Sequence, residues 1–270
     1  MLPDLSEFAN RNRGSNAICV IWEIGEEPLE SLYAVVGKTL DRPAFERYDR
    51  LFWEKDRKRY LCSHFLRRAL LSKLTGVPKD EILFATNRFG KPYPIYGGSH
   101  WSAEKWNFNV SSSGNRVAFV ATDSGQCGID VETFSGDKRQ PDLKQMSKSD
   151  IFSAREKEFL IYGPGSLEQR FYQIWTLKEA YLKYTGRGLG DIENTDMFDL
   201  MNLQLPMKDG RWVSDKGDAA AFHSSEESYA LSVVVKRDQA MPQVHILNNE
   251  QVFSLANGTF PGKRKSDSHA

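Results

Sequence analysis

Two acids that lie one residue apart are the first candidates for chemistry in this sequence. Asp130 and Glu132 belong to the stretch GIDVET, residues 128–133, which reads as a β-strand. Alternate side chains of a strand share a face, so both carboxylates point the same way. Taken alone, such a pair is typical of a solvated strand face.

A helical stretch further along the chain carries a third acid and a lysine. In FYQIWTLKEAYLKYTGRGL, residues 171–189, Glu179 precedes Lys183 by four positions. This spacing is also the favoured surface ion pair of any helix, contributing about 0.2–0.5 kcal/mol. On a helical wheel, however, Tyr172 and Trp175 fall on the same side as Glu179 and Lys183. Because the helix has apolar residues on both sides, we predict that its polar face lies in a cleft.

Together the two segments suggest a site for a hard cation. Three carboxylates, Asp130, Glu132 and Glu179, stand in elements that read as neighbours in a core. Mg²⁺ prefers carboxylate oxygens and keeps water or substrate phosphates as its remaining ligands. The combination therefore favours a magnesium site over two unrelated solvated pairs.

The elements that must position these side chains read as an α+β fold in two halves. In the first half we expect a strand over 17–24, a long helix over 45–73, and three strands within 106–133 that form an antiparallel meander. In the second half we expect a helix opened by a capping box at Ser153 and Glu156, and a helix over 167–184. Further strands are expected near 197–205, 211–213, 219–222 and 229–235. Each half is thus predicted to be a small, mainly antiparallel sheet with a packed long helix.

Domain boundaries are expected where the series of predicted helices and strands is interrupted. The polar, Gly- and Pro-containing stretch 134–150 reads as a linker. We divide the chain into an N-terminal half, 1–122, a C-terminal half with the acids, 123–240, and a flexible tail, 241–270.

Composition narrows the classes of function. Lys plus Arg and Asp plus Glu both number 36, so the net charge is zero and nothing favours a nucleic-acid binder. The three cysteines form no disulfide framework or zinc motif, and no apolar run reaches the ~20 residues that span a bilayer. We therefore expect a cytoplasmic protein without a membrane segment. Local charge is uneven, because residues 46–73 hold nine Lys or Arg against four Asp or Glu.

At the level of motifs, the sequence resembles a known enzyme family. GIDVE at 128–132 and WTLKEAYLK at 175–183 resemble the signatures (V/I)G(I/V)D(V/I)E and WxxKEAxxK of the surfactin-synthetase-type 4′-phosphopantetheinyl transferases. FGKP at 89–92 and FNVSSSGNRVAFVAT at 108–122 are similar to further stretches of that family, in the same order. The resemblance extends over about residues 22–235.

The resemblance implies an activity and a metal. Members move the 4′-phosphopantetheine arm of coenzyme A to a serine of an apo acyl or peptidyl carrier protein and release adenosine 3′,5′-bisphosphate. It implies Mg²⁺ as the cofactor, held by Asp130, Glu132 and Glu179. Glu179, or a metal-bound water that it orients, would take the serine proton, and Lys183 would contact the pyrophosphate. Lys178 would be a supporting contact or solvated.

The resemblance also implies which residues contact coenzyme A. These are Arg47, Arg59, Lys91, Ser111, Ser112 and Lys183. One position departs from the family pattern, because Ser112 stands where a phosphate-binding histidine is usual. A neutral hydrogen bond is roughly half as strong as a charge-assisted one, so we expect weaker coenzyme A binding or compensation by another cation such as Arg116.

Chain length and the remaining alternatives complete the prediction. Shorter members of the family resemble one half of this chain and trimerise, so this chain is expected to be a pseudo-dimer of two similar subdomains that acts as a monomer. Two alternatives are a catalytically weakened homologue that only binds carrier proteins, and another Mg²⁺-dependent phosphoryl-transfer enzyme.

Overall fold

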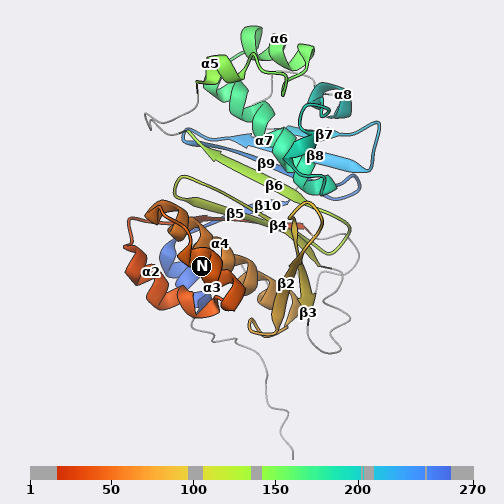
Figure 1. Ribbon diagram of the computed structural model, residues 1–270. Helices are drawn as coiled ribbons and strands as arrows, with labels where there is room; N and C mark the ends of the chain where they lie inside the picture. The colour runs from red at the N-terminus through yellow and green to blue at the C-terminus, as the bar shows by residue number, and fades with distance from the viewer. Residues whose placement is uncertain are drawn as a thin grey trace, which may run out of the picture.

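The computed structural model describes residues 17–96, 106–134, 142–201, 203, 210–240 and 242–256. Two four-stranded sheets lie in the middle of the molecule, with helices on both outer sides (Figure 1). The first sheet contains β1 (Ala17–Glu23), β4 (Asn107–Ser113), β5 (Arg116–Thr122) and β10 (Gln243–Leu247), in the order β10-β1-β5-β4. The second contains β6 (Gly128–Thr133), β7 (Gly210–Val213), β8 (Ala219–Ser225) and β9 (Tyr229–Lys236), in the order β6-β9-β8-β7.

The inner faces of the two sheets form one apolar core. Alternation along β6 sends Ile129 and Val131 into this core, which leaves Asp130 and Glu132 for the other face. The fully buried side chains of the core include Cys19, Ile21, Val120, Ile129, Val131 and Val235. The predicted alternation of the GIDVET strand is therefore confirmed.

Helices of the first half cover the outer face of the first sheet. The long helix α4 (Glu54–Thr75) packs there with α2 (Leu29–Val36), α3 (Arg42–Asp49) and α9 (Asn249–Ala256). A 3₁₀ turn, η1 (Gly37–Thr39), joins α2 to α3, and a hairpin of β2 (Ile82–Thr86) and β3 (Pro92–Tyr96) follows α4. Helix α4 stops at Gly76, whose φ of 75° is a left-handed conformation that glycine adopts without strain.

Helices of the second half cover the outer face of the second sheet. Helix α7 (Leu167–Thr185) is the central one, accompanied by α5 (Leu143–Met146), α6 (Ala154–Tyr162), the 3₁₀ turn η2 (Leu189–Asp191) and α8 (Met197–Met201). The predicted capping box of α6 is present, since the Ser153 hydroxyl accepts from the Glu156 amide and the Glu156 carboxylate accepts from the Ser153 amide. The predicted helix over 167–184 is also confirmed.

Some predicted elements are wrong. The expected three-strand meander ends after β5, because β6 pairs with β9 of the second sheet instead of with β5. The expected helix over 45–73 is two helices, α3 and α4. The expected strand at 197–205 begins as helix α8, and residues 202 and 204–205 lie outside the described ranges.

Two predicted boundaries also need correction. The flexible tail expected from residue 241 is wrong for 243–256, where β10 pairs in parallel with β1 and α9 packs beside α4. Residues 257–270 lie outside the described part. The expected linker 134–150 does not connect the halves, because β6 before it and α6 after it both belong to the second half; residues 135–141 are not described.

Candidate active site between the two halves

The site lies where the edge strands of the two sheets, β4 and β6, run side by side. From β4, the Ser111 hydroxyl donates to Asp130 Oδ1 at 2.7 Å, and the Ser113 hydroxyl donates to Glu132 Oε2 at 2.7 Å. Two residues before Ser111 on β4, the side-chain oxygen Oδ1 of Asn109 accepts the Ile129 backbone amide at 2.9 Å. Side chains at every second position of β4 thus hold β6 in register, and they bring residues of both halves into one site.

We call the junction of β4, β6 and α7 the seam. Lys183 of α7 connects two of the predicted acids there. Its Nζ lies 2.5 Å from Asp130 Oδ1 and 3.1 Å from Glu179 Oε2, and it donates to Ser111 Oγ at 3.2 Å. The structure therefore brings together Asp130, Glu179, Lys183 and Ser111. Glu132 lies beside them, electrostatically coupled to both Glu179 and Lys183.

Burial gives these charges unusual protonation behaviour. Burial raises the pKa of Asp130 to about 7, with Glu179 and Glu132 adding to the rise and Lys183 opposing it. Burial also raises the pKa of Glu132, against the hydrogen bond from Ser113. For Lys183, burial lowers the pKa, but Asp130 and Glu179 outweigh it and the net shift is upward. One ammonium among three carboxylates leaves an excess of negative charge in a partly dehydrated site.

One oxygen of the cluster has no protein partner. Asp130 Oδ2 is buried and accepts no hydrogen bond, an arrangement that costs free energy unless a ligand meets it. Within the part of the chain that the structure describes, no three acidic, imidazole or thiol groups are already gathered as metal ligands. The ammonium of Lys183 lies between Asp130 and Glu179 instead.

Close contact between β6 and α7 fixes the distance between the side chains of α7, Glu179 and Lys183, and the acids of β6, Asp130 and Glu132. A Cβ atom on Gly128 would overlap the Ala180 carbonyl oxygen and would lie 2.5 Å from the Tyr184 amide nitrogen. The glycine of the GIDVE motif therefore allows the helix backbone to approach the strand directly.

A buried ion pair fixes the other side of the same helix. Lys178 Nζ lies 2.7 Å from Glu156 Oε2, with side chains 1% and 0% exposed, and it also donates to the Thr195 carbonyl oxygen. Of the two alternatives for Lys178, the solvated side chain is wrong, and the contact that the structure shows is this ion pair. Sequence reasoning missed Glu156 as its partner, because the two residues belong to different helices.

Of the two predicted cations of the first half, Arg59 lies close enough to act on an acid of the seam, whereas Arg47 lies on the surface of α3. Arg59 forms an ion pair with Asp56 of its own helix and acts electrostatically on Glu132. Arg47 is exposed, with its guanidinium 5.5 Å from the centre of the Tyr60 ring. Neither touches the carboxylate cluster directly.

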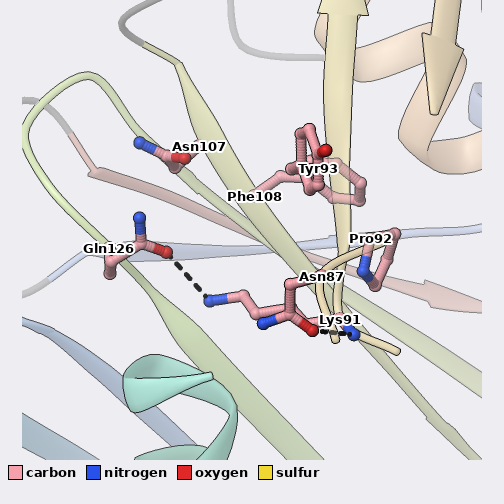
Figure 2. A pocket seen from close by; sticks show the side chains of 7 residues that line it. All are labelled: Asn87, Lys91, Pro92, Tyr93, Asn107, Phe108 and Gln126. Carbon is pink, nitrogen blue, oxygen red and sulfur yellow. Dashed lines mark hydrogen bonds between the residues drawn. The ribbon is translucent and has the colours of Figure 1, made fainter. Parts of the chain in front are cut away.

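Lys91 of the FGKP turn lies at the opposite end of the seam. Its Nζ donates to the Cys127 carbonyl oxygen at 2.9 Å and to Gln126 Oε1 at 3.2 Å, and burial lowers its pKa. Lys91 lines a cavity of about 300 Å³, whose lining side chains are drawn in Figure 2. The cavity is also lined by Asn87, Pro92, Tyr93, Asn107, Phe108 and Gln126.

Ser112, which replaces the usual histidine of the family, and Arg116, which was expected to compensate for it, point to opposite faces of the first sheet. Ser112 is exposed and lies opposite Val117 of β5, on the face towards α4. Arg116 points to the other face, where it lies 3.0 Å from Glu23 Oε1, donates to Ser228 Oγ and stacks on Tyr229. The geometry therefore contradicts the idea that Arg116 compensates at position 112.

Sequence reasoning also missed two side chains of β4 that bond to β6: Ser113, which donates to Glu132, and Asn109, which accepts the Ile129 amide. A signal was present, because Asn109, Ser111 and Ser113 alternate along one strand and so share a face. Polar residues at every second position of a strand next to an acidic strand could have identified them.

Buried carboxylates and a lysine thus meet in a seam between two α+β halves. Comparison with known proteins specifies the class. The profile of the 4′-phosphopantetheinyl transferase superfamily matches residues 126–234, and that of the 4′-phosphopantetheinyl transferase N-terminal region matches residues 26–124.

Individual relatives agree with these profiles. The chain is 31% identical over 214 residues to 4′-phosphopantetheinyl transferase pptA of Paxillus involutus, covering 73% of this chain and 75% of that protein. It is 29% identical over 178 residues to HetI of Nostoc sp., covering 66% and 72%, and 27% identical over 223 residues to psf-1 of Bacillus pumilus, covering 80% and 86%. Both are named as 4′-phosphopantetheinyl transferases.

The chain belongs to the 4′-phosphopantetheinyl transferase family. Its reaction is the transfer of 4′-phosphopantetheine from coenzyme A to a carrier protein.

Proposed function

We propose that this transfer takes place at the β4–β6–α7 seam and that Asp130, Glu132, Glu179 and Lys183 carry it. The observation that supports this most directly is the position of Lys183 Nζ between Asp130 and Glu179, beside Ser111 of the other half. In this reaction the carrier serine Oγ forms a bond to the β-phosphorus of coenzyme A. The bond from that phosphorus to the bridging oxygen breaks, and adenosine 3′,5′-bisphosphate leaves with the electron pair.

Glu179 is proposed as the group that accepts the serine proton. It is mostly buried, with a side chain 13% exposed, and its Oε2 lies at the centre of the cluster next to Lys183. Lys183 would hold the pyrophosphate oxygens, where a fixed ammonium stabilises the charge that accumulates in phosphoryl transfer.

The donor set also fits Mg²⁺. Three carboxylates and the unpartnered Asp130 Oδ2 offer the hard oxygen ligands that this ion prefers. Asp130, Glu132 and Glu179 are the residues proposed to hold it, and the ion would neutralise pyrophosphate charge when bound.

We propose that residues around the seam make the remaining contacts to coenzyme A. Arg59 supplies positive charge on the side of Glu132, and Lys91 supplies it at the other end of the seam. Arg47, whose guanidinium lies over Tyr60 of the same helix as Arg59, is proposed as a further contact. Ser111 and Ser112 lie near the end of β4, where Ser111 is bonded to Asp130 and Ser112 is exposed.

Two comparable halves, each with a four-stranded sheet under a long helix, support a pseudo-dimer with its site at the junction. We propose the boundary near residue 122, with β10 and α9 added to the first half. A junction inside one chain leaves no need for a second subunit, so we propose a monomer.

We propose a cytoplasmic location because the cysteine thiols are not oxidised to disulfides. Cys19, Cys62 and Cys127 are free and buried, as is usual in a reducing cytoplasm. Within the described ranges, every helix is too short or too polar to cross a membrane.

Intact-mass spectrometry tests the proposal. Apo carrier protein, coenzyme A and Mg²⁺ should give a carrier heavier by one phosphopantetheine, and Glu179→Gln should abolish the gain. Glu158→Gln, an exposed acid on α6, is the matched control and should retain it. Full activity of Glu179→Gln would show that the catalytic assignment is wrong, while no gain with any carrier would contradict the function itself.

A further inference from the structure

The most exposed large apolar side chain of the described residues lies at the turn between α3 and α4. Phe52 is 83% exposed, and its neighbour Trp53 is 54% exposed. Their rings meet edge to face, with centroids 4.9 Å apart. Phe45 on α3 is a further exposed ring, at 44%. We call Phe52 and Trp53 the aromatic corner.

The aromatic corner is presented by a fixed turn. Arg57 of α4 folds back onto the turn, where its Nε donates to the Leu51 carbonyl oxygen at 2.6 Å and its Nη2 donates to the Asp49 carbonyl oxygen at 3.2 Å. The same guanidinium lies 5.7 Å from the centre of the Tyr48 ring. Apolar rings held in place on a surface lose little conformational entropy when a partner covers them.

Positive charge surrounds the aromatic corner in a protein whose net charge is zero. Residues 42–59 hold seven Lys or Arg and four Asp or Glu, an excess of three positive charges. Arg47, Arg50 and Lys55 are exposed beside the rings. Aromatic residues and arginine are the types enriched where proteins bind each other, and an uneven charge favours a partner of opposite sign.

The aromatic corner lies close to the catalytic seam. Trp53 is the residue that precedes α4, and Arg59 of the same helix acts electrostatically on Glu132. Arg59 follows Trp53 by six positions, which is about 9 Å along the helix axis. A protein that covers the rings therefore also reaches the rim of the seam on the Glu132 side.

We propose that the aromatic corner and its basic surroundings are the docking surface for the carrier protein, on a helical face that combines acidic side chains with an apolar residue. This inference rests on the proposed function, because the carrier must place its serine hydroxyl beside Glu179. A lipid surface is the other partner that exposed aromatics and basic residues fit. The carrier is favoured because the corner lies beside a site that must receive a protein side chain.

Steady-state kinetics test this proposal with a matched control. In Phe52→Ser/Trp53→Ser, the KM for apo carrier should rise about tenfold, the effect of losing about 1.4 kcal/mol of binding, while kcat and the KM for coenzyme A stay within about twofold. The control, Ile161→Ser/Tyr162→Ser, removes an apolar pair that is 61% and 81% exposed at the end of α6, and it should change none of these values. Lys55→Glu should also raise the KM for carrier, most strongly at low salt.

Other results would overturn the proposal. A rise in the KM for coenzyme A would assign the aromatic corner to the nucleotide, and an effect of the control pair alone would place docking on the second half. An unchanged KM for carrier, with wild-type binding to anionic vesicles that the double variant loses, would assign the corner to membranes. In each case wild-type transfer still occurs, whereas failure of wild type to modify any carrier would contradict the proposed function.

Discussion

Lys178 and Glu156 form an ion pair that excludes water, and Lys178 is next in sequence to Glu179, the proposed acceptor of the serine proton. Nζ and Oε2 are 2.7 Å apart, and the two side chains are 1% and 0% exposed. Glu156 also accepts the amides of Ser153 and Met197, so one carboxylate joins the starts of α6 and α8 to the middle of α7. The pair fixes α7 from the side opposite the seam.

Removing one member of this pair should be strongly destabilising. Lys178→Met leaves the Glu156 carboxylate buried without its cation, which typically costs about 3–5 kcal/mol. Urea unfolding of the variant checks this. Lys157→Met, which removes an exposed pair with Asp150, should change the free energy of unfolding by less than about 1 kcal/mol.

A double variant shows whether the destabilisation comes from the unpaired charge or from the changed shape of the side chain. Lys178→Met/Glu156→Gln leaves no unpaired charge, while the glutamine oxygen still accepts one backbone amide. It should be more stable than Lys178→Met alone. If the double variant is the less stable of the two, the pair does not act through its charge.

Gly128→Ala should move the two sides of the site apart. The new Cβ meets backbone atoms of Ala180 and Tyr184, which cannot rotate away, so α7 must shift from β6. We expect about 1–3 kcal/mol of destabilisation and a loss of activity on the order of 100-fold. Thermal unfolding and transfer kinetics measure both effects.

Gly190→Ala is the control for this substitution. Nothing lies within 4 Å of a Cβ at Gly190, although it follows the same helix. Its activity and stability should remain at the wild-type level. Wild-type activity of Gly128→Ala would contradict the close approach of strand and helix.

Local signals predicted the elements that hold the site, but not their partners. The amphipathic pattern of α7 and the alternation of β6 depend on nearby residues, and the structure confirms both. The pairing of β6 with β9 joins residues about a hundred positions apart, and nothing in either strand specifies it. The same holds for Glu156 and Lys178, since a helical wheel contains no residue of another helix.

Two wrong predictions have physical causes that the structure shows. The stretch from 197 contains alternating apolar residues, yet Asp196 Oδ1 accepts the Phe198 amide and Glu156 accepts the Met197 amide, which begins a helix. The expected tail is ordered by a distant partner, because β10 pairs in parallel with β1 and buries Leu247, and α9 then buries Val252 in the first core.

Ser112→His should strengthen coenzyme A binding. Ser112 is exposed at the end of β4 near the seam, so an imidazole fits there without displacing core side chains. A protonated histidine would add a charge-assisted hydrogen bond to a phosphate, and the KM for coenzyme A should fall by about threefold to tenfold. The gain should be larger at pH 6 than at pH 8, because imidazole is charged below its usual pKa of about 6.5.

Ser254→His is the matched control for an added imidazole. Ser254 is exposed on α9 and lies outside the seam. The control should leave the KM for coenzyme A unchanged at both pH values. An unchanged or raised KM in Ser112→His would show that a histidine at this position does not contact the ligand.

His64 should make the free energy of unfolding decrease as the pH falls below about 6.5. It is 2% exposed on α4, its Nδ1 has no hydrogen-bond partner, and burial, with further contributions from Arg67 and Arg68, lowers its pKa to about 2. The unfolded chain takes up this proton below about pH 6.5 and the folded chain does not, so stability falls as the pH decreases from 6.5. One such group costs about 2 kcal/mol between pH 6.5 and pH 5, at 1.36 kcal/mol per pH unit. Urea unfolding should show that loss in wild type, in excess of the loss in His64→Leu. Equal losses in the two proteins would mean that His64 can be protonated in the folded state.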